Sequence, residues 1–450
     1  MPNDHASIAE RPAPAAAPEL APRLQQAMQW HADGRLDEAE AGYRNVLAEV
    51  PAHPDALHLL GVLKAQRGHH AEAARLIAAA IAARPHEAMF HNNYGNVCTE
   101  CGRLDEAEAS YLRALELDGT RVDALNNLGV LLGARGDAAG AEKVLRRVVE
   151  LAPDFTDARQ NLASHLFRSG RLPEAVQQCV EGLLVAPRSA ALRRVLGVAY
   201  SMMGMKDEAI AVWRAWLQAE PGNALAEHHL RACTGEDVPA RAADAYVQRV
   251  FDAFAVSFDA KLASLAYRAP ELVAQALARH AGEPRRDRAV LDAGCGTGLC
   301  APLLAPWSAR LVGVDLSAGM LAKARARGGY GELVQAELVA FLRERGRAWD
   351  LIVSADTLCY FGVLEDFAAA AAAALRPRGL LVFTVEALDA ASEDAGTDHR
   401  LLEHGRYSHR RGYVERVLRE AGLRVLEIAA AVLRSEGGDP VHGWVVVASA

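Results

Sequence analysis

The chain has 450 residues, enough for two or three domains that each bury a core. Its formal net charge of −8 at pH 7 argues against a nucleic-acid-binding protein that relies on a broad basic surface. Seven scattered cysteines form no regular disulfide framework, and no apolar run is long enough for a signal peptide or a membrane span. We therefore expect a cytoplasmic protein that binds neither nucleic acid nor membranes, with a disordered Pro/Ala-rich tail at residues 1–19.

The first half of the chain is a repeat with a period of 34 residues. The hexapeptide GRLDEA occurs at 34–39 and again at 102–107. Glycine recurs with this period at Gly34, Gly68, Gly102, Gly136, Gly170 and Gly204. Alanine stands five residues after every glycine, and proline stands seventeen residues after five of the six. We therefore predict one helix hairpin per repeat. The first helix ends at the glycine, the second has a small residue where the two helices cross, and proline ends the second helix.

This pattern closely resembles the tetratricopeptide repeat, in six copies over about residues 20–223. The resemblance implies an all-α superhelix, which we assign to residues 20–235, with a concave surface that binds a protein or peptide partner. Self-association and simple spacing of another domain are the alternative roles. Cys98 and Cys101 have CxxC spacing inside one repeat, but no second pair completes a zinc site, so we expect no metal.

Three asparagines repeat with the same period at one position of the first helix: Asn93, Asn127 and Asn161. They resemble the asparagine ladder of the repeats in protein O-linked N-acetylglucosamine transferases. An amide both donates and accepts, so such a ladder can pair with the backbone of an extended peptide. Alternatively, the asparagines satisfy polar groups between neighbouring repeats.

After residue 235 the repeat stops, and from Ala289 apolar runs alternate with helical segments. The runs are AVLDAG, LVGVD, GELVQA, WDLIVSA, GLLVFTVE, LRVLEIA and GWVVVAS. Strands that alternate with helices predict a doubly wound α/β sheet, which binds ligands at the carboxyl ends of its strands. The turn VLDAGCGTG at 290–298 follows the first of these strands and is therefore expected at the ligand.

The spacing of this turn indicates which ligand it holds. Its glycines Gly294, Gly296 and Gly298 form GxGxG, whereas a dinucleotide fingerprint needs a glycine where Leu299 stands. The Asp292 carboxylate before them would repel a pyrophosphate but suits a cofactor that carries positive charge. S-adenosylmethionine carries a sulfonium and an ammonium group and has no phosphate.

Two further carboxylates follow the next two strands. Asp315 ends the second strand, where a carboxylate can accept both ribose hydroxyls, although Asp315 alone would also suit NAD. Glu337 follows the third strand, where it can accept from the adenine amino group. Together with the glycine turn, these carboxylates favour S-adenosylmethionine as the cofactor.

Residues 246–450 resemble the class I S-adenosylmethionine-dependent methyltransferases. The match extends to LSAGMLAKAR after Asp315, to WDLIVSADTLCYF and to LRPRGLLVFTVE. More narrowly, residues 246–270 and 406–423 resemble bacterial methyltransferases fused to tetratricopeptide repeats. The resemblance implies a Rossmann-like domain, which we assign to 236–450, with a seven-stranded sheet whose last strand is antiparallel. It also implies a helical N-terminal cap, holding Phe258 and Tyr267, that closes over the cofactor. The expected cofactor-binding residues are Asp292, Gly294, Gly296, Gly298, Asp315, Leu316, Met320, Ala336, Glu337 and Ser354.

The sequence indicates less about the residues that contact the methyl acceptor. The fourth strand ends Ser354-Ala355-Asp356, without the Asp/Asn-Pro-Pro-Tyr motif of many amino-methylating enzymes, and no Pro-Cys pair like that of cytosine C5 enzymes is present. We therefore do not expect DNA base methylation. A hydroxyl or a protonated amine would need a general base, whereas a carboxylate acceptor would need none.

The candidate acceptor-side residues are Asp356 at the end of the fourth strand, and Tyr407 and His409 in the loop after the fifth. His399 and His404 lie in the same loop. His409 is favoured as the base because RYSHRR directly precedes a helix, at the cofactor end of the sheet.

The sequence thus predicts a multidomain α plus α/β protein that is an S-adenosylmethionine-dependent methyltransferase. We expect its acceptor, favoured to be a protein or peptide, to be recruited or organised by the repeats. The alternatives are a small-molecule methyltransferase whose repeats serve only assembly, a catalytically inactive scaffold, and another S-adenosyl chemistry such as aminopropyl transfer.

Overall fold

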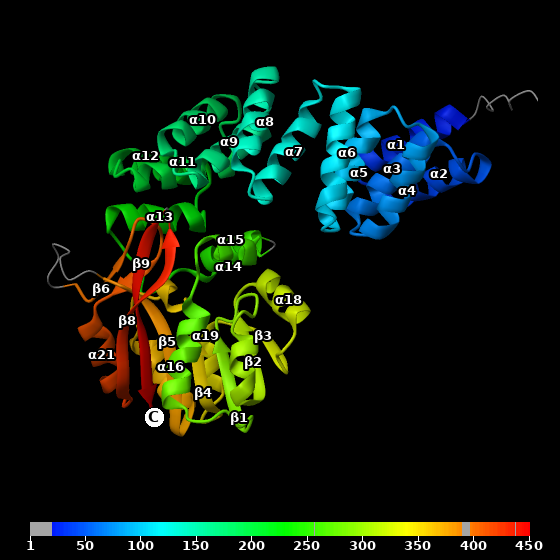
Figure 1. Cartoon of the computed structure of the whole chain (residues 1–450). Coiled ribbons are helices and arrows are strands. Elements are labelled where there is room, and N and C mark those ends of the chain that lie inside the picture. Colours follow the sequence, from blue (N-terminus) through cyan, green and yellow to red (C-terminus); the bar gives the residue numbers. More distant parts are fainter. Residues whose placement is uncertain (1–19, 256, 389–396, 437) are drawn as a thin grey trace, which may run out of the picture. The chain divides into compact units, whose positions relative to one another are not determined.

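The computed structural model describes residues 20–255, 257–388, 397–436 and 438–450 (Figure 1). The chain divides into two compact units, residues 1–165 and residues 166–450. The predicted disordered tail at 1–19 lies outside the described residues. Among the residues described, no helix has the length and apolar character that crossing a membrane requires.

Helix hairpins build the first unit, as the 34-residue period predicts. The helices are α1 (Leu20–Ala32), α2 (Leu36–Glu49), α3 (Pro54–Gln66), α4 (His70–Ala83), α5 (Ala88–Glu100), α6 (Leu104–Leu117), α7 (Val122–Ala134), α8 (Ala138–Leu151) and α9 (Thr156–Arg168), whose last residues belong to the second unit. The repeat glycines of both units have φ between +70° and +87°, the left-handed conformation that ends a helix and that glycine adopts without strain.

A small residue in the first helix of a repeat allows close packing against the second. A Cβ added at Gly95 in α5 would lie 2.5 Å from the ring of Tyr111 in α6. Both Tyr111 and the repeat alanine Ala107 are buried. The helices α5 and α6 of this repeat can therefore approach closely because Gly95 has no side chain.

The second unit continues the hairpins and then changes to an α/β fold. Its remaining repeat helices are α10 (Leu172–Val185), α11 (Ala190–Met202) and α12 (Lys206–Ala219), and one further helix, α13 (Ala224–Thr234), follows the last repeat. A linker of residues 235–243 follows. The helices α14 (Asp244–Phe254), α15 (Phe258–Ser264) and α16 (Ala269–His280) then lead into the sheet.

The sheet in the described part of the chain has nine strands. All of them except the two shortest match the seven apolar runs of the sequence. The strands are β1 (Arg288–Ala293), β2 (Ser308–Asp315), β3 (Glu332–Gln335), β4 (Trp349–Ser354), β5 (Leu375–Ala387), β6 (His399–Leu401), β7 (Tyr407–His409), β8 (Arg424–Glu436) and β9 (Asp439–Ser449). The order is β3-β2-β1-β4-β5 with parallel pairing, and β9 joins β5 and β8 in antiparallel pairing. The antiparallel last strand is as expected, whereas the short hairpin β6–β7 beside the end of β5 was not predicted.

Helices cover both faces of this sheet. On one face, α19 (Leu338–Glu344), α20 (Glu365–Ala374) and α21 (Arg411–Glu420) pack on strand residues such as Leu291 and Ile352. On the other, α16, α17 (Ala301–Leu304) and η1 (Ala305–Trp307) pack on residues such as Val290 and Val353. Adjacent strand residues face opposite layers, which explains the continuous apolar runs. The connections α18 (Ala318–Arg327) and η2 (Leu358–Tyr360) follow β2 and β4.

Candidate functional site

A cavity lies at the carboxyl ends of β1, β2 and β4, where a doubly wound sheet is expected to bind its ligand. It is lined by Arg241, Ala242, Val247, Phe251, Phe258, Gly294, Gly296, Val314, Asp315, Leu316, Met320, Ala336, Glu337, Leu338, Asp356, Thr357, Tyr360 and Phe361. Seven of the ten residues predicted to bind cofactor belong to this lining. The other three, Asp292, Gly298 and Ser354, do not line it.

The glycine turn needs its glycines for two different reasons. Gly294 has φ +79°, and a Cβ there would lie 2.1 Å from the Thr357 hydroxyl oxygen. Gly296 has φ +53°, and a Cβ there would meet only the Phe258 ring, at 3.9 Å. Gly294 therefore allows close packing beneath the turn, whereas Gly296 presents bare backbone to the cavity.

Asp315 holds the turn from the end of β2. Its Oδ2 accepts from the Gly296 N–H at 2.9 Å, and its Oδ1 accepts from the Ser317 N–H at 2.9 Å. Burial raises the pKa of this carboxyl, although these backbone donors lower it. Each carboxylate oxygen can accept a second hydrogen bond, so Asp315 can still receive two hydroxyls.

Asp292 lies behind the turn rather than in the cavity. It is 1% exposed, and its Oδ2 accepts from the Tyr330 hydroxyl at 2.5 Å. Burial raises the pKa of Asp292 to about 7; the Tyr330 hydrogen bond opposes this rise and the charge of Asp315 adds to it. Ser354 is buried beside it and donates to the Ala293 carbonyl at 2.8 Å, so both residues support the strands that carry the turn.

Glu337 lines the cavity and also caps a helix. Its two carboxylate oxygens accept from the Val339 and Ala340 N–H groups at 3.1 and 2.8 Å, at the N-terminus of α19. The Arg241 guanidinium lies 4.0 Å from Glu337. These contacts fix the carboxylate in the wall of the cavity.

The helical cap is attached to the turn by two aspartates that sequence reasoning missed. Asp259 in α15 accepts from the Thr297 hydroxyl at 2.5 Å and pairs with Arg327. Asp252 in α14 accepts from the Ser317 hydroxyl and from the Gly319 N–H. Of the two predicted cap residues, Phe258 lines the cavity and Tyr267 does not.

The linker between the repeats and the cap forms another wall of the cavity. Arg241 pairs with Phe361 in a single antiparallel bridge, and the Ala242 N–H donates to the Tyr360 carbonyl at 2.8 Å. Gly362 donates to the Ala240 carbonyl at 2.8 Å. Nothing in the local sequence marks Arg241, because its place depends on backbone pairing with a segment about 120 residues away in the chain.

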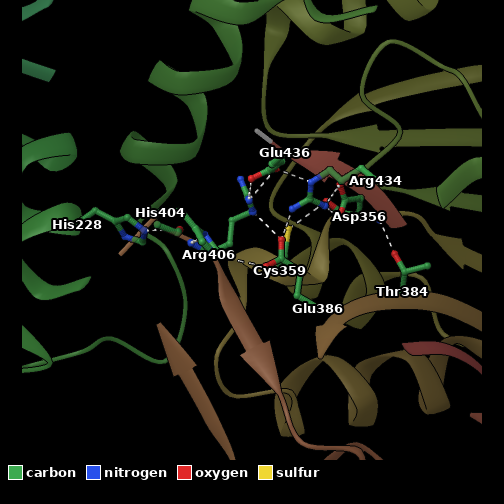
Figure 2. A network of polar contacts seen from close by, with 10 residues as sticks. His228, Asp356, Cys359, Thr384, Glu386, His404, Arg406, Arg434 and Glu436 are labelled. Atoms are coloured by element: carbon green, nitrogen blue, oxygen red, sulfur yellow. Dashed lines mark hydrogen bonds and ion pairs between the residues drawn. The ribbon is translucent and has the colours of Figure 1, made fainter. Parts of the chain in front are cut away.

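Asp356 reaches the cavity from the end of β4 and is held by a buried ion-pair network (Figure 2). Arg434 Nη1 lies 2.8 Å from both Asp356 carboxylate oxygens, and Arg434 also pairs with Glu386 and Glu436. Arg406 pairs with the same two glutamates. Asp356 has φ +57°, and its N–H donates to the Thr384 hydroxyl at 2.8 Å.

Opposing effects set the ionisation of this network. Burial raises the pKa of Asp356, and Arg434 lowers it only partly. For Glu386, burial also raises the pKa, but Arg406 and Arg434 outweigh it and the net direction is downward. Asp356, Cys359 and Glu386 place possible metal ligands within 4.8 Å of one another. Because Arg434 already pairs with both carboxylates, these residues form an ion-pair network rather than a cation site.

The structure does not bring His409 or Tyr407 to the cavity. His409 is fully buried, its Nε2 donates to the Gly362 carbonyl at 3.1 Å, and burial lowers its pKa to about 4. The Tyr407 hydroxyl donates to the Pro239 carbonyl at 2.8 Å. Both side chains instead hold the loops behind the cavity, and of the three predicted acceptor-side residues only Asp356 lines it.

Segments in both halves of the chain match known protein families. Residues 265–428 match the family described as methyltransferase domain, and residues 58–121 and 132–195 match families described as tetratricopeptide repeat. The chain joins tetratricopeptide repeats to a methyltransferase domain.

The methyltransferase domain is also similar to curated proteins. Methyltransferase-like protein 27 from Homo sapiens is 37% identical over 115 residues, which cover 25% of this chain and 46% of that protein. Trans-aconitate 2-methyltransferase from Paracidovorax citrulli is 40% identical over 94 residues, which cover 20% of this chain and 36% of that protein. The chain thus spans less than half the length of these relatives.

A solved structure of PilW, a type IV pilus biogenesis factor, covers 46% of this chain with a TM-score of 0.43 and 23% identity.

In the tetratricopeptide repeats, the three periodic asparagines connect neighbouring repeats. Asn127 Nδ2 donates to Asn92 Oδ1 at 3.1 Å, and Asn161 Nδ2 donates to Asn126 Oδ1 at 2.8 Å. Asn93 Nδ2 lies 2.8 Å from His58 Nε2. Each amide nitrogen therefore contacts a residue 35 positions earlier, in the preceding repeat.

Proposed function

We propose that this protein transfers a methyl group from S-adenosylmethionine to a protein or peptide that the tetratricopeptide repeats recruit. The observation that carries the proposal is the convergence of a GxGxG turn, Asp315 and Glu337 on one cavity of a methyltransferase domain. The residue types fit the cofactor. Gly296 offers bare backbone, Asp315 can accept from two ribose hydroxyls, and Glu337 can accept from the adenine amino group.

The bound cofactor would supply an activated methyl group on a positively charged sulfur. The chain's own contribution is alignment, since an in-line displacement gains most from holding the two reacting atoms in position. The cap residues Phe251 and Phe258, with Tyr360, supply apolar walls that keep water from the reacting atoms.

The charge of the cavity supports an acceptor that is not a polyanion. Three carboxylates line it, Asp315, Glu337 and Asp356, while Arg241 is the only lysine or arginine among the described lining residues. Arg434, behind Asp356, is 3% exposed and already paired with three carboxylates. Arg241 in turn pairs with Asp244 and Glu337, so among the described lining residues a tricarboxylic acid such as trans-aconitate would find no unengaged lysine or arginine.

Cofactor binding by the full chain tests the first part of the proposal. Asp315→Ala removes a charged acceptor, which is worth roughly 1.5–3 kcal/mol, so S-adenosylmethionine should bind more than tenfold more weakly in calorimetry. Glu332→Ala, which removes a half-exposed carboxylate that pairs with Arg310 and Arg345 at the start of β3, is the control and should bind normally. Equal binding of NADH and S-adenosylmethionine would contradict the proposal.

Transfer of labelled methyl groups tests the acceptor. A lysate incubated with the protein and methyl-labelled S-adenosylmethionine should carry label in the protein fraction, and purified trans-aconitate should accept none. Label confined to small molecules would favour the alternative of a small-molecule methyltransferase. Absence of any label with intact cofactor binding would favour an inactive scaffold.

A further inference from the structure

The hairpin β6–β7 lies against α13, the helix that follows the last repeat. His228 in α13 donates from Nε2 to the Gly405 carbonyl at 2.8 Å, and its ring stacks on Tyr246 with ring centroids 3.9 Å apart. Ala232 in α13 packs on Leu401 and Tyr407 of the hairpin. His228 is 3% exposed, so this contact is a built interface within the second unit.

Gly405 is fitted closely to that interface. It has φ +89°, and a Cβ there would lie 2.9 Å from the Tyr246 hydroxyl and 3.1 Å from His229 Cε1. Only glycine can therefore bring this turn of the hairpin against α13 without moving its partners. The turn is completed by the Gly405 N–H, which donates to the Leu402 carbonyl at 2.7 Å.

The next residue in the hairpin belongs to the network behind the cavity. Arg406 Nε lies 2.6 Å from Glu386, and its Nη2 lies 2.7 Å from Glu436. Both glutamates also pair with Arg434, which holds the cavity residue Asp356. Figure 2 shows the resulting sequence of contacts from His228 in α13 to Asp356 and Thr384.

We propose that His228 is a positioning residue for the cavity: by holding Gly405 it fixes Arg406, which in turn holds the Glu386–Arg434–Asp356 network in place. The helix α13, which follows the last repeat, thereby helps to shape the methyltransferase site. Because Arg406 and Arg434 share two carboxylates, a shift of the hairpin leaves those carboxylates partly uncompensated and changes how Arg434 holds Asp356. This inference goes beyond the proposed methyl transfer and does not depend on the acceptor.

Amide hydrogen exchange on the full chain tests it without cofactor or acceptor. His228→Phe keeps a ring that can stack on Tyr246 but removes the donor to Gly405. We expect exchange to become roughly three- to tenfold faster both in residues 399–409 and in residues 354–361, the segment that carries Asp356. His228→Gln keeps an amide N–H near the position of Nε2 and should restore near-normal exchange in both segments.

The control for folding is exchange in β1 and β2, which should match that of the wild-type chain. Faster exchange in the hairpin alone would overturn the proposal, because the hairpin would then not be coupled to the cavity. Equal acceleration throughout the second unit, or a His228→Gln variant that behaves like His228→Phe, would also overturn it. If His228→Phe does not fold, Arg406→Met tests the next link, and it should accelerate exchange at 354–361 while leaving 399–405 protected.

Discussion

Arg434 Nη1 lies 2.8 Å from both carboxylate oxygens of Asp356, at the point where the cavity meets the buried ion-pair network. The same guanidinium pairs with Glu386 and Glu436 and is 3% exposed. One cation from β8 thus compensates three carboxylates from three different segments. Its removal would leave the Asp356 carboxylate without its ion-pair partner, and Glu386 and Glu436 with Arg406 alone.

The first prediction follows from that imbalance. Arg434→Met should destabilise the second unit by about 3–5 kcal/mol, because breaking a buried ion pair from one side leaves its charges uncompensated. Arg376→Met is the matched control, since Arg376 pairs with Asp350 at the surface with 48% of its side chain exposed. That change should cost at most ~1 kcal/mol. Urea unfolding measures both variants, and similar losses of stability would contradict the prediction.

The second prediction concerns the pH dependence of cofactor binding. Burial raises the pKa of Asp292 to about 7, so this carboxyl is largely protonated at pH 6 and ionised at pH 8. A positively charged sulfonium favours the ionised form. Binding of S-adenosylmethionine should therefore tighten as pH rises from 6 to 8, by at most about tenfold for a pKa of 7.

S-adenosylhomocysteine and a variant supply the controls for this pH effect. S-adenosylhomocysteine lacks the sulfonium charge and should show a smaller pH dependence in calorimetry, and Asp292→Asn should remove the difference between the two ligands. In the free protein the sign is opposite. A raised pKa means that the folded state binds the proton more strongly, so this group's contribution to stability falls as pH rises from about 4 toward 7. Identical pH profiles for the two ligands would count against a role for Asp292.

Local sequence patterns predicted the features that depend on local chemistry. The repeat glycines correctly predicted the ends of the first helices, because glycine adopts without strain the left-handed conformation at which each of these helices ends. The apolar runs predicted the strands, and the GxGxG turn predicted which edge of the sheet carries the cavity. Each of these depends on residues within a few positions of one another.

The acceptor side depends on residues far apart in the sequence and was therefore less predictable. Asp356 and Arg434 are separated by 78 positions, and nothing near either residue indicates the pair. The strands β6 and β7 have three residues each, too short for a recognisable alternation. From the local sequence, His409 resembles a catalytic residue in a loop. In the structure it is buried, with a hydrogen bond to Gly362 and its ring stacked on Tyr413, and no local pattern reveals these contacts.

The third prediction separates two roles for His409. Since the side chain is buried and donates to Gly362, we expect His409→Ala to lower the melting temperature, whereas His409→Gln, which keeps a donor, should lower it less. Methylation by the remaining folded protein should fall by much less than a hundredfold. A loss of a hundredfold or more in turnover at an unchanged melting temperature would instead support His409 as a general base.

The last prediction concerns the asparagines that connect neighbouring repeats. Because the amide nitrogens of Asn93, Asn127 and Asn161 contact the preceding repeats, replacing all three with alanine should lower the melting temperature of the array. Each hydrogen bond is worth about 0.5–1.5 kcal/mol. Burial lowers the pKa of His58 to about 4, so its neutral ring can accept from Asn93 at physiological pH.

Variants of the same asparagines also test whether the repeats recruit the acceptor protein by pairing with its peptide backbone. Asn→Asp at the three positions keeps an acceptor oxygen but removes the donor to the preceding repeat. If the ladder recruits the acceptor, the alanine variant should lose methyl labelling of lysate proteins at temperatures where it remains folded, while binding S-adenosylmethionine normally. The aspartate variant should lose stability to a similar degree and retain part of the labelling. Unchanged protein labelling in the alanine variant would leave these asparagines with only their structural role between repeats.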